Sequence, residues 1–184
     1  GPTSVPVFMA ALKFAGRHGV ASALAGGLRN IKAPDPDWTA LQPFLDDLES
    51  SNAARNTRLR SSALALSRLL TSRGVQSVFL KGAALLLEDN AAATWRELSD
   101  LDVLVAPENI ESAAEAMRAH GYCTVSDPSA YQDRYHHHYA PLYHRGEDVT
   151  VELHVRLMQN LWDDLVRPEE IFSRAQLANM ADEL

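Results

Sequence analysis

The amino-acid sequence predicts an α+β or α/β domain that follows an N-terminal helical region. Residues 59–70 carry apolar side chains at helical spacing, whereas residues 75–80 and 101–105 have the pattern of strands. With 184 residues, the chain has room for one domain with a core of its own. The expected parts are the helical region at 5–73, the core at 74–158 and a C-terminal helical segment at 159–184.

The first part of the chain is expected to be helical. Residues 5–30 are rich in Ala, Leu and Gly, which is typical of one or two short helices. The prolines of "APDPDW" (33–38) end a helix, and Asp37 can cap the next one. From about 37 to 73 the pattern is helical again, and Gly74 ends it. The apolar stripe of this helix consists of Leu59, Ala63, Leu66 and Leu70.

The sequence period changes after this helix. "VQSVFL" (75–80) predicts a strand, and "KGAALLLED", which begins at Lys81, predicts a helix directly after it. A loop that contains Trp95 and Arg96 leads to the strand at 101–105. The order strand, helix, strand indicates a sheet with helices packed on it.

The second half of the core repeats this alternation. "APENIESAAEAMRAHGY" predicts a helix with Pro107 in its first turn and Gly121 at its end. Two further strands are expected at 135–144 and 149–155, joined by "RGED" as a hairpin turn. A short helix is expected from about residue 157.

Composition and charge exclude several classes of protein. A net charge of −7 argues against a general attraction to nucleic acid or to an anionic membrane. Lys13, Arg17 and His18 interrupt the most hydrophobic stretch, so no membrane-spanning helix is predicted. The single cysteine, Cys123, excludes an internal disulfide and a cysteine-based zinc site, and it fits a reducing cytoplasm. Residues 1–4, which begin Gly-Pro, are expected to be a remnant of tag cleavage.

Two predicted strands carry acidic side chains that folding alone does not require. Asp100 and Asp102 lie on one face of their strand, about 6–7 Å apart, where they repel each other. In "VTVELHVRL", Glu152 faces the same way as His154 and Arg156. If the two strands are neighbours, the three carboxylates converge and need cations, and oxygen ligands suit Mg²⁺ or Mn²⁺. Two such ions about 3.5–4 Å apart would suit an in-line displacement at phosphorus.

A phosphate site is predicted beside these acids. In "VFLKGAALLL" the strand runs through Lys81 and Gly82 directly into a helix, where backbone N–H groups can receive phosphate oxygens. Lys81 and Arg96 could then offset the charge of a triphosphate. The alternatives are a surface lysine at position 81, an Arg96–Glu97 pair that only holds the loop, and acids at a solvated strand end.

The histidine-rich stretch "HHHYAPLYH" suggests a zinc site only at first sight. In a strand, His136 and His138 face one way and His137 the other, so the three cannot bind one ion without a bulge. We expect His138 and His154 to contact phosphate or the acceptor, or to partner the acids.

The order of the segments "FLKGAALL", "WRELSDLDVLV", "HHHYAPLYH" and "VELHVRL" resembles the uncharacterised nucleotidyltransferase family of the polymerase-beta-like superfamily. The resemblance covers roughly residues 74–158. It implies a nucleotidyltransferase fold, in which a mixed sheet is flanked by helices and residues 74–158 form the catalytic core. In the wider superfamily a serine often follows the first glycine. Here Ala83 follows it, so a hydroxyl contact to phosphate would be missing.

The resemblance also implies an activity, the Mg²⁺-dependent transfer of a nucleoside monophosphate from a nucleoside triphosphate to an acceptor, with release of pyrophosphate. The metal would be bound by Asp100, Asp102 and Glu152, the last of which would also help to deprotonate the acceptor. The nucleotide would be bound by Lys81, Gly82, Ala83, Arg96 and Ser99, and His138, His154 and Arg156 are candidates for acceptor or phosphate contacts.

The substrates are less defined than the reaction. ATP is the first candidate nucleotide, and the acceptor is a small metabolite, an antibiotic-like hydroxyl, a protein side chain or an RNA end. The net negative charge argues against a long nucleic acid. Two alternatives stay open: an inactive nucleotide-binding regulatory module, which the residue Ala83 favours, and a metal-dependent phosphohydrolase that uses the same acids.

Overall fold

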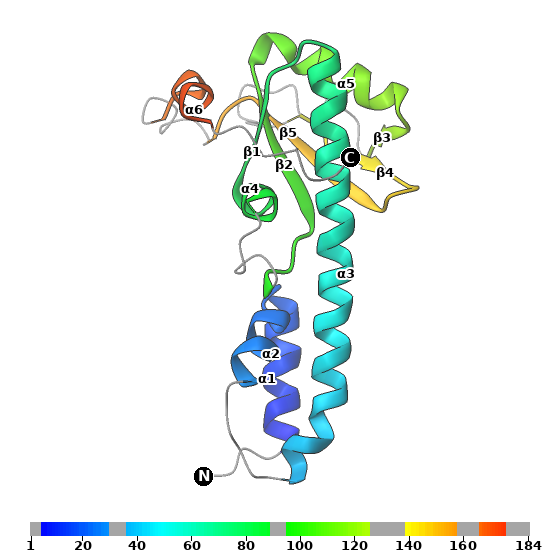
Figure 1. Cartoon of the computed structure of the whole chain (residues 1–184), viewed down its shortest axis with the longest axis vertical. Coiled ribbons are helices and arrows are strands. Elements are labelled where there is room, and N and C mark those ends of the chain that lie inside the picture. Colours follow the sequence, from blue (N-terminus) through cyan, green and yellow to red (C-terminus); the bar gives the residue numbers. More distant parts are fainter. Residues whose placement is uncertain (1–4, 30–35, 89–94, 126–138, 158–165, 176–184) are drawn as a thin grey trace. The chain divides into compact units, whose positions relative to one another are not determined.

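The structure, a computed structural model, describes residues 5–29, 36–88, 95–125, 139–157 and 166–175. It has the α+β fold that the sequence predicts, with a mixed five-stranded sheet, packed helices and an N-terminal helical region (Figure 1). Among the described helices, none combines the length and the apolar character that a membrane span requires.

The chain forms two compact units. Unit 1 consists of the described residues within 1–57 and 89–98, and unit 2 consists of those within 58–88 and 99–184. The longest helix, α3 (Pro36–Ser72), contributes residues to both. The division of the chain at residues 73 and 158 stays a prediction.

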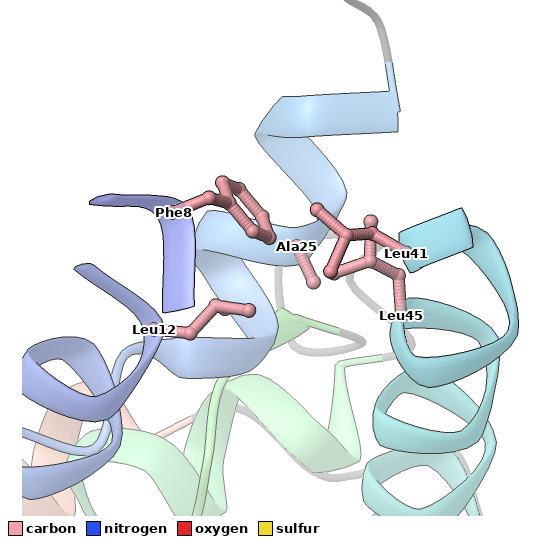
Figure 2. Close-up of a cluster of buried hydrophobic side chains, with 5 residues drawn as sticks. All are labelled: Phe8, Leu12, Ala25, Leu41 and Leu45. Carbon is pink, nitrogen blue, oxygen red and sulfur yellow. The ribbon is translucent and has the colours of Figure 1, made fainter. Parts of the chain in front are cut away.

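Unit 1 is built from α1 (Val5–Arg17), α2 (Ala21–Arg29) and the first part of α3. The two helices expected within residues 5–30 are thus confirmed, and Gly19 with a φ of 63° forms the turn between them. Apolar side chains at helical spacing on all three helices meet in one cluster (Figure 2). This cluster contains Phe8, Leu12, Ala25, Leu41 and Leu45.

Polar side chains of α3 hold a second segment of unit 1, Trp95–Leu98. The Nδ2 atoms of Asn52 and Asn56 donate to the carbonyl oxygen of Arg96 at 3.3 and 3.1 Å. The Nε atom of Arg55 donates to the carbonyl oxygen of Leu98 at 2.6 Å. Both asparagines are buried, so these bonds satisfy polar groups that have left water.

Unit 2 contains the sheet, whose strand order is β1 (Ser77–Phe79), β2 (Asp100–Val105), β5 (Val149–His154), β4 (Leu142–His144) and β3 (Tyr122–Thr124). The pair β2–β5 is parallel, and the other three neighbouring pairs are antiparallel. The sheet is therefore mixed, and its one parallel pair lies between β1 and β4.

The strands match the sequence prediction in place but not in every bound, since β1 is shorter than the expected 75–80. The hairpin of β4 and β5 has its turn at 145–148, as "RGED" predicts. Strand β3 was not predicted, because three residues after Gly121 are too few to show a period. Of the strand expected at 135–144, residues 142–144 form β4, residues 139–141 are irregular, and residues 135–138 lie outside the described residues.

Besides the second part of α3, the described residues of unit 2 form further helices and a 3₁₀ turn. Helix α4 (Lys81–Leu87) contacts β1 and β2, and α5 (Ile110–Ala119) follows a 3₁₀ turn at Pro107–Asn109. Residue 157, where a short helix was expected to begin, is irregular, and residues 158–165 lie outside the described residues. The described helix in this region, α6 (Pro168–Arg174), begins later.

The core of unit 2 lies on one face of β2 and β5. The inward side chains of the two strands are at most 1% exposed, as the strand alternation predicts. They are Leu101, Val103, Val105, Val149, Val151 and Leu153. Buried alanines and Met117 of α5 add to this core. The opposite face of the same two strands carries the acidic residues.

Candidate active site

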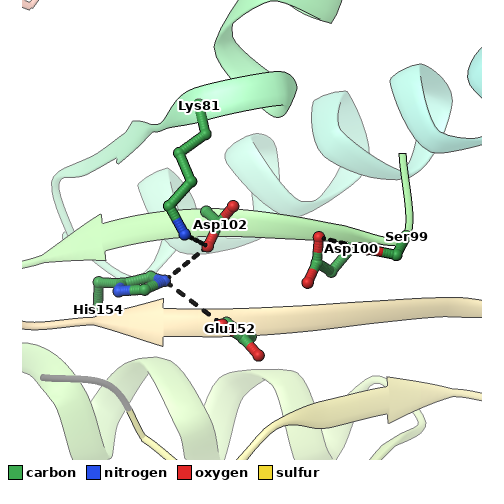
Figure 3. Close-up of polar contacts among 6 residues, drawn as sticks. All are labelled: Lys81, Ser99, Asp100, Asp102, Glu152 and His154. Atoms are coloured by element: carbon green, nitrogen blue, oxygen red, sulfur yellow. Dashed lines mark hydrogen bonds and ion pairs between the residues drawn. The ribbon is translucent and has the colours of Figure 1, made fainter. Parts of the chain in front are cut away.

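The parallel pairing of β2 and β5 brings together two of the three predicted acids, Asp102 and Glu152. Asp102 is paired with Glu152 in the register of the two strands, and Leu104 is paired with His154. Because side chains alternate along a strand, Asp102, Glu152 and His154 share one face of the sheet (Figure 3). The prediction that the two acidic strands are neighbours is confirmed.

Asp102 is the centre of the site. Its Oδ1 atom lies 2.7 Å from Lys81 Nζ and 2.7 Å from His154 Nε2. A carboxylate only accepts hydrogen bonds, so Nε2 of His154 carries the hydrogen in this contact. The side chains of Asp102 and His154 are 7% and 2% exposed, whereas that of Lys81 is 58% exposed. Oδ1 of the buried Asp102 thus has a buried donor, His154, and a solvated donor, Lys81.

Burial and these two donors act on the pKa of Asp102 in opposite directions. Burial raises the pKa, since it disfavours the charged carboxylate. The hydrogen bonds from His154 and Lys81 and the charges of both residues lower it, and together they outweigh burial. The pKa of Asp102 therefore lies below its ordinary value, and the carboxylate is ionised at neutral pH.

Asp102, Glu152 and His154 also form a group of potential metal ligands. One oxygen or nitrogen atom from each of them lies within 4.8 Å of the other two. The Nε2 atom of His154 is 3.7 Å from Glu152 Oε2, and the Glu152 side chain is 25% exposed. Two carboxylates and one imidazole suit a divalent cation such as Mg²⁺, Mn²⁺ or a later transition metal.

Asp100 lies beside this group on β2 but is not part of it. Its Oδ1 atom accepts a hydrogen bond of 3.0 Å from Ser99 Oγ. The spacing of two residues along a strand separates Asp100 from Asp102 by about 6–7 Å, as the sequence suggests. The compact set of donor atoms therefore contains His154 instead of Asp100.

Lys81 has an unusual backbone. Its φ is 50°, in the left-handed region that favours glycine, although it is the first residue of α4. The N–H of the preceding residue, Leu80, donates to the backbone carbonyl of Asp102 at 2.9 Å. The start of α4 is thus attached to β2 by a backbone bond and by the ion pair at the same residue, Asp102.

Residues 8–183 match the family described as uncharacterised nucleotidyltransferase. The chain belongs to this nucleotidyltransferase family. The match extends well beyond residues 74–158, where the sequence segments quoted above lie, and it includes the helices of unit 1. No curated protein and no solved structure gives a significant match.

The other residues predicted for the site have diverse surroundings. Gly82 and Ala83 are buried within α4, a helix of seven residues. Ser99 is exposed and contacts Asp100. Arg96 has an exposed side chain and belongs to unit 1, while its carbonyl is held by α3. Arg156 follows β5 and is exposed, and His138 lies outside the described residues.

The sequence left the role of His154 open between a ligand contact and a partner of the acids, and in the structure His154 is buried against Asp102. The sequence analysis missed Asn52 and Asn56. Their spacing continues the apolar stripe that begins at Leu59, and this was the available signal that both side chains are buried.

Proposed function

We propose that the chain is a metal-dependent nucleotidyltransferase that moves a nucleoside monophosphate from a nucleoside triphosphate to an acceptor and releases pyrophosphate. Membership of the family supports the reaction class. The observation that carries the proposal is the pairing of Asp102 with Glu152 on adjacent parallel strands, with His154 in reach of both. Two like charges at neighbouring positions are unfavourable unless cations offset them.

The residues present fit a divalent cation. Asp102 and Glu152 supply oxygen donors, and His154 supplies a nitrogen donor once the hydrogen on Nε2 has moved to Nδ1. Asp100 is a further carboxylate on the same face of the sheet. Mg²⁺ or Mn²⁺ is the expected ion. When bound, such an ion supplies positive charge to the triphosphate oxygens.

Glu152 and Asp102 have different tasks in the proposed reaction. Asp102 is buried and ionised by its donors, so it serves to bind the cation. Glu152 is more exposed and accepts the proton of the acceptor hydroxyl. The acceptor oxygen then forms a bond to the α-phosphorus. The bond between the α-phosphorus and the oxygen that bridges it to the β-phosphorus breaks, and pyrophosphate leaves.

Cationic and small residues would bind the triphosphate. Lys81 contacts Asp102 directly, and its ammonium can also contact phosphate oxygens. Arg96, Ser99, Gly82 and Ala83 stay proposals that rest on the family resemblance. ATP is the first nucleotide to test, and the acceptor is a small molecule, a protein side chain or an RNA end. The exposed and reduced Cys123 is compatible with action in the cytoplasm.

Thermal unfolding with each of ATP, GTP, CTP and UTP, with and without Mg²⁺, tests the binding part of the proposal. A ligand of the native state raises the melting temperature once its concentration exceeds its dissociation constant. We expect one nucleotide to stabilise the wild type only with Mg²⁺. The double variant Asp100→Ala/Asp102→Ala should not respond. Stabilisation of both proteins alike would place the nucleotide elsewhere.

Product analysis with the stabilising nucleotide and pooled acceptors tests the chemistry. With a nucleotide labelled at its α-phosphate, a transferase attaches the label to an acceptor and releases pyrophosphate. The variant Glu152→Gln, which keeps the size of the side chain, should abolish this release. A phosphohydrolase would release inorganic phosphate instead. A regulatory module would bind nucleotide without turnover in both the wild type and the variant.

A further inference from the structure

We propose that Lys81 is a tethered counter-ion of Asp102 that a divalent cation must displace, so that Lys81 weakens metal binding until a nucleotide offers its phosphate oxygens to the released ammonium. This inference rests on the metal site of the proposed function and adds its regulation. It assigns to Lys81 a role before any nucleotide is bound.

The first observation is the competition for one carboxylate. Lys81 Nζ and His154 Nε2 both contact Oδ1 of Asp102 at 2.7 Å. A divalent cation that binds Asp102 lies next to the same ammonium, and like charges at such short distances repel strongly in a partly buried site. The ammonium of Lys81 and the cation therefore compete for Asp102.

The second observation is that Lys81 is tethered at one end and solvated at the other. Its backbone has a φ of 50°, where glycine would be unstrained, and Leu80 N–H is bonded to the carbonyl of Asp102. Such strain persists only where the surroundings impose it, and it is often found at functional sites. The side chain is 58% exposed, so the ammonium can leave Asp102 for water without a change in the backbone.

Two states of the site follow. Without metal, Lys81 neutralises the charge of Asp102. With metal, the cation neutralises it, and the ammonium needs another partner, which a triphosphate provides. The nucleotide then removes a cost of metal binding, and by linkage the metal strengthens nucleotide binding through the same residue. Lys81 thus couples the two ligands.

Direct measurement of Mn²⁺ affinity without nucleotide tests this role. Isothermal titration calorimetry and the EPR signal of free Mn²⁺ would give the affinity of the wild type and of Lys81→Met. The variant Lys13→Met is the control for the loss of an exposed lysine. We expect Lys81→Met to bind Mn²⁺ about threefold to tenfold more tightly, the range for a partly exposed charge-assisted contact. Lys13→Met should match the wild type. Unchanged or weaker binding by a folded Lys81→Met would overturn the proposal.

The variant Asp102→Asn separates this inference from the proposed function. If Mn²⁺ binds wild type and Asp102→Asn equally, the metal site is wrong, and both proposals fail. If binding needs Asp102 but Lys81→Met changes nothing, only the role of Lys81 fails. With a non-hydrolysable triphosphate analogue present, the gain in Mn²⁺ affinity should be larger for the wild type than for Lys81→Met.

A measurement on the wild-type protein tests the displacement of Lys81 even if the variants do not fold. The sequence has only three lysines, Lys13, Lys32 and Lys81, so the NMR spectrum of protein labelled with ¹⁵N at lysine Nζ is simple. In the metal-free protein the ammonium hydrogens of Lys81 should exchange slowly with water because Asp102 holds them. Saturating Mg²⁺ should accelerate this exchange at Lys81 alone. Continued slow exchange in the Mg²⁺-bound protein would contradict displacement.

Discussion

His154 and Asp102 form a buried pair across the two parallel strands of the sheet. Their contact is 2.7 Å, although in the strand register His154 lies opposite Leu104 and Asp102 lies opposite Glu152. The pair is thus diagonal, and this places Nε2 of His154 between the two carboxylates. The imidazole of His154 thus lies next to both carboxylates, where it can affect which metal ion the site prefers.

Acid should remove the stabilising effect of Asp102. Its folded-state pKa lies below the ordinary value of 3.8, so the ionised carboxylate stabilises the fold at pH values above 3.8. This contribution is lost as the pH falls through the lower, folded-state pKa. In urea unfolding at several pH values between about 2 and 6, the stability advantage of wild type over Asp102→Asn should shrink on acidification. An advantage that is independent of pH would contradict the shifted pKa.

His154 should influence which metal binds. Imidazole favours Mn²⁺ and later transition metals over Mg²⁺ more than carboxylate does. We expect His154→Gln to lose about tenfold or more in Mn²⁺ affinity and less in Mg²⁺ affinity. Titration calorimetry of the metal-free protein with each ion measures both. His18→Gln, which removes an exposed histidine of unit 1, is the control. Equal losses for the two ions would mean that His154 only orients Asp102.

The left-handed backbone at position 81 predicts a difference between two small substitutions. Lys81→Gly and Lys81→Ala both remove the ion pair with Asp102, but only glycine is unstrained at a φ of 50°. Lys81→Gly should therefore be about 1 kcal/mol more stable than Lys81→Ala. Urea unfolding of both variants in EDTA gives the comparison. If alanine is as stable as glycine, position 81 does not have this backbone in solution.

Two adjacent glycines of α2 offer a matched test of unit 1. A Cβ atom on Gly26 would lie 2.5 Å from Cε3 of Trp95, whereas a Cβ atom on Gly27 would meet no atom within 4 Å. Gly26→Ala should cost about 1–3 kcal/mol through overpacking. Gly27→Ala should stabilise the helix by up to about 1 kcal/mol. Thermal or urea unfolding would show effects of opposite sign, and two stabilising changes would mean that Trp95 does not pack on α2.

Local patterns explain why so much of the fold was predictable. The helix of residues 37–73 and the strands at 75–80, 101–105 and 149–155 each repeat apolar side chains over several residues, and such a repeat shows which face is buried. Strand β3 has three residues and no such repeat, so it becomes a strand only by pairing with β4. The same limit applies to the segment Trp95–Leu98. Arg55 binds the carbonyl of Leu98 from 43 positions earlier in the chain, and Asn56 binds that of Arg96 from 40 positions earlier.

The reactive groups of this protein can be recognised in its sequence, because acids at alternate strand positions and a lysine before a helix are local patterns. Which of these groups meet depends on the tertiary structure. Strand order and register depend on packing between distant segments, and a shift of one residue would turn Glu152 and His154 to the other face. The parallel pairing of β2 and β5 places His154, rather than Asp100, in the group with Asp102 and Glu152, and the start of α4 brings Lys81 to the same carboxylate.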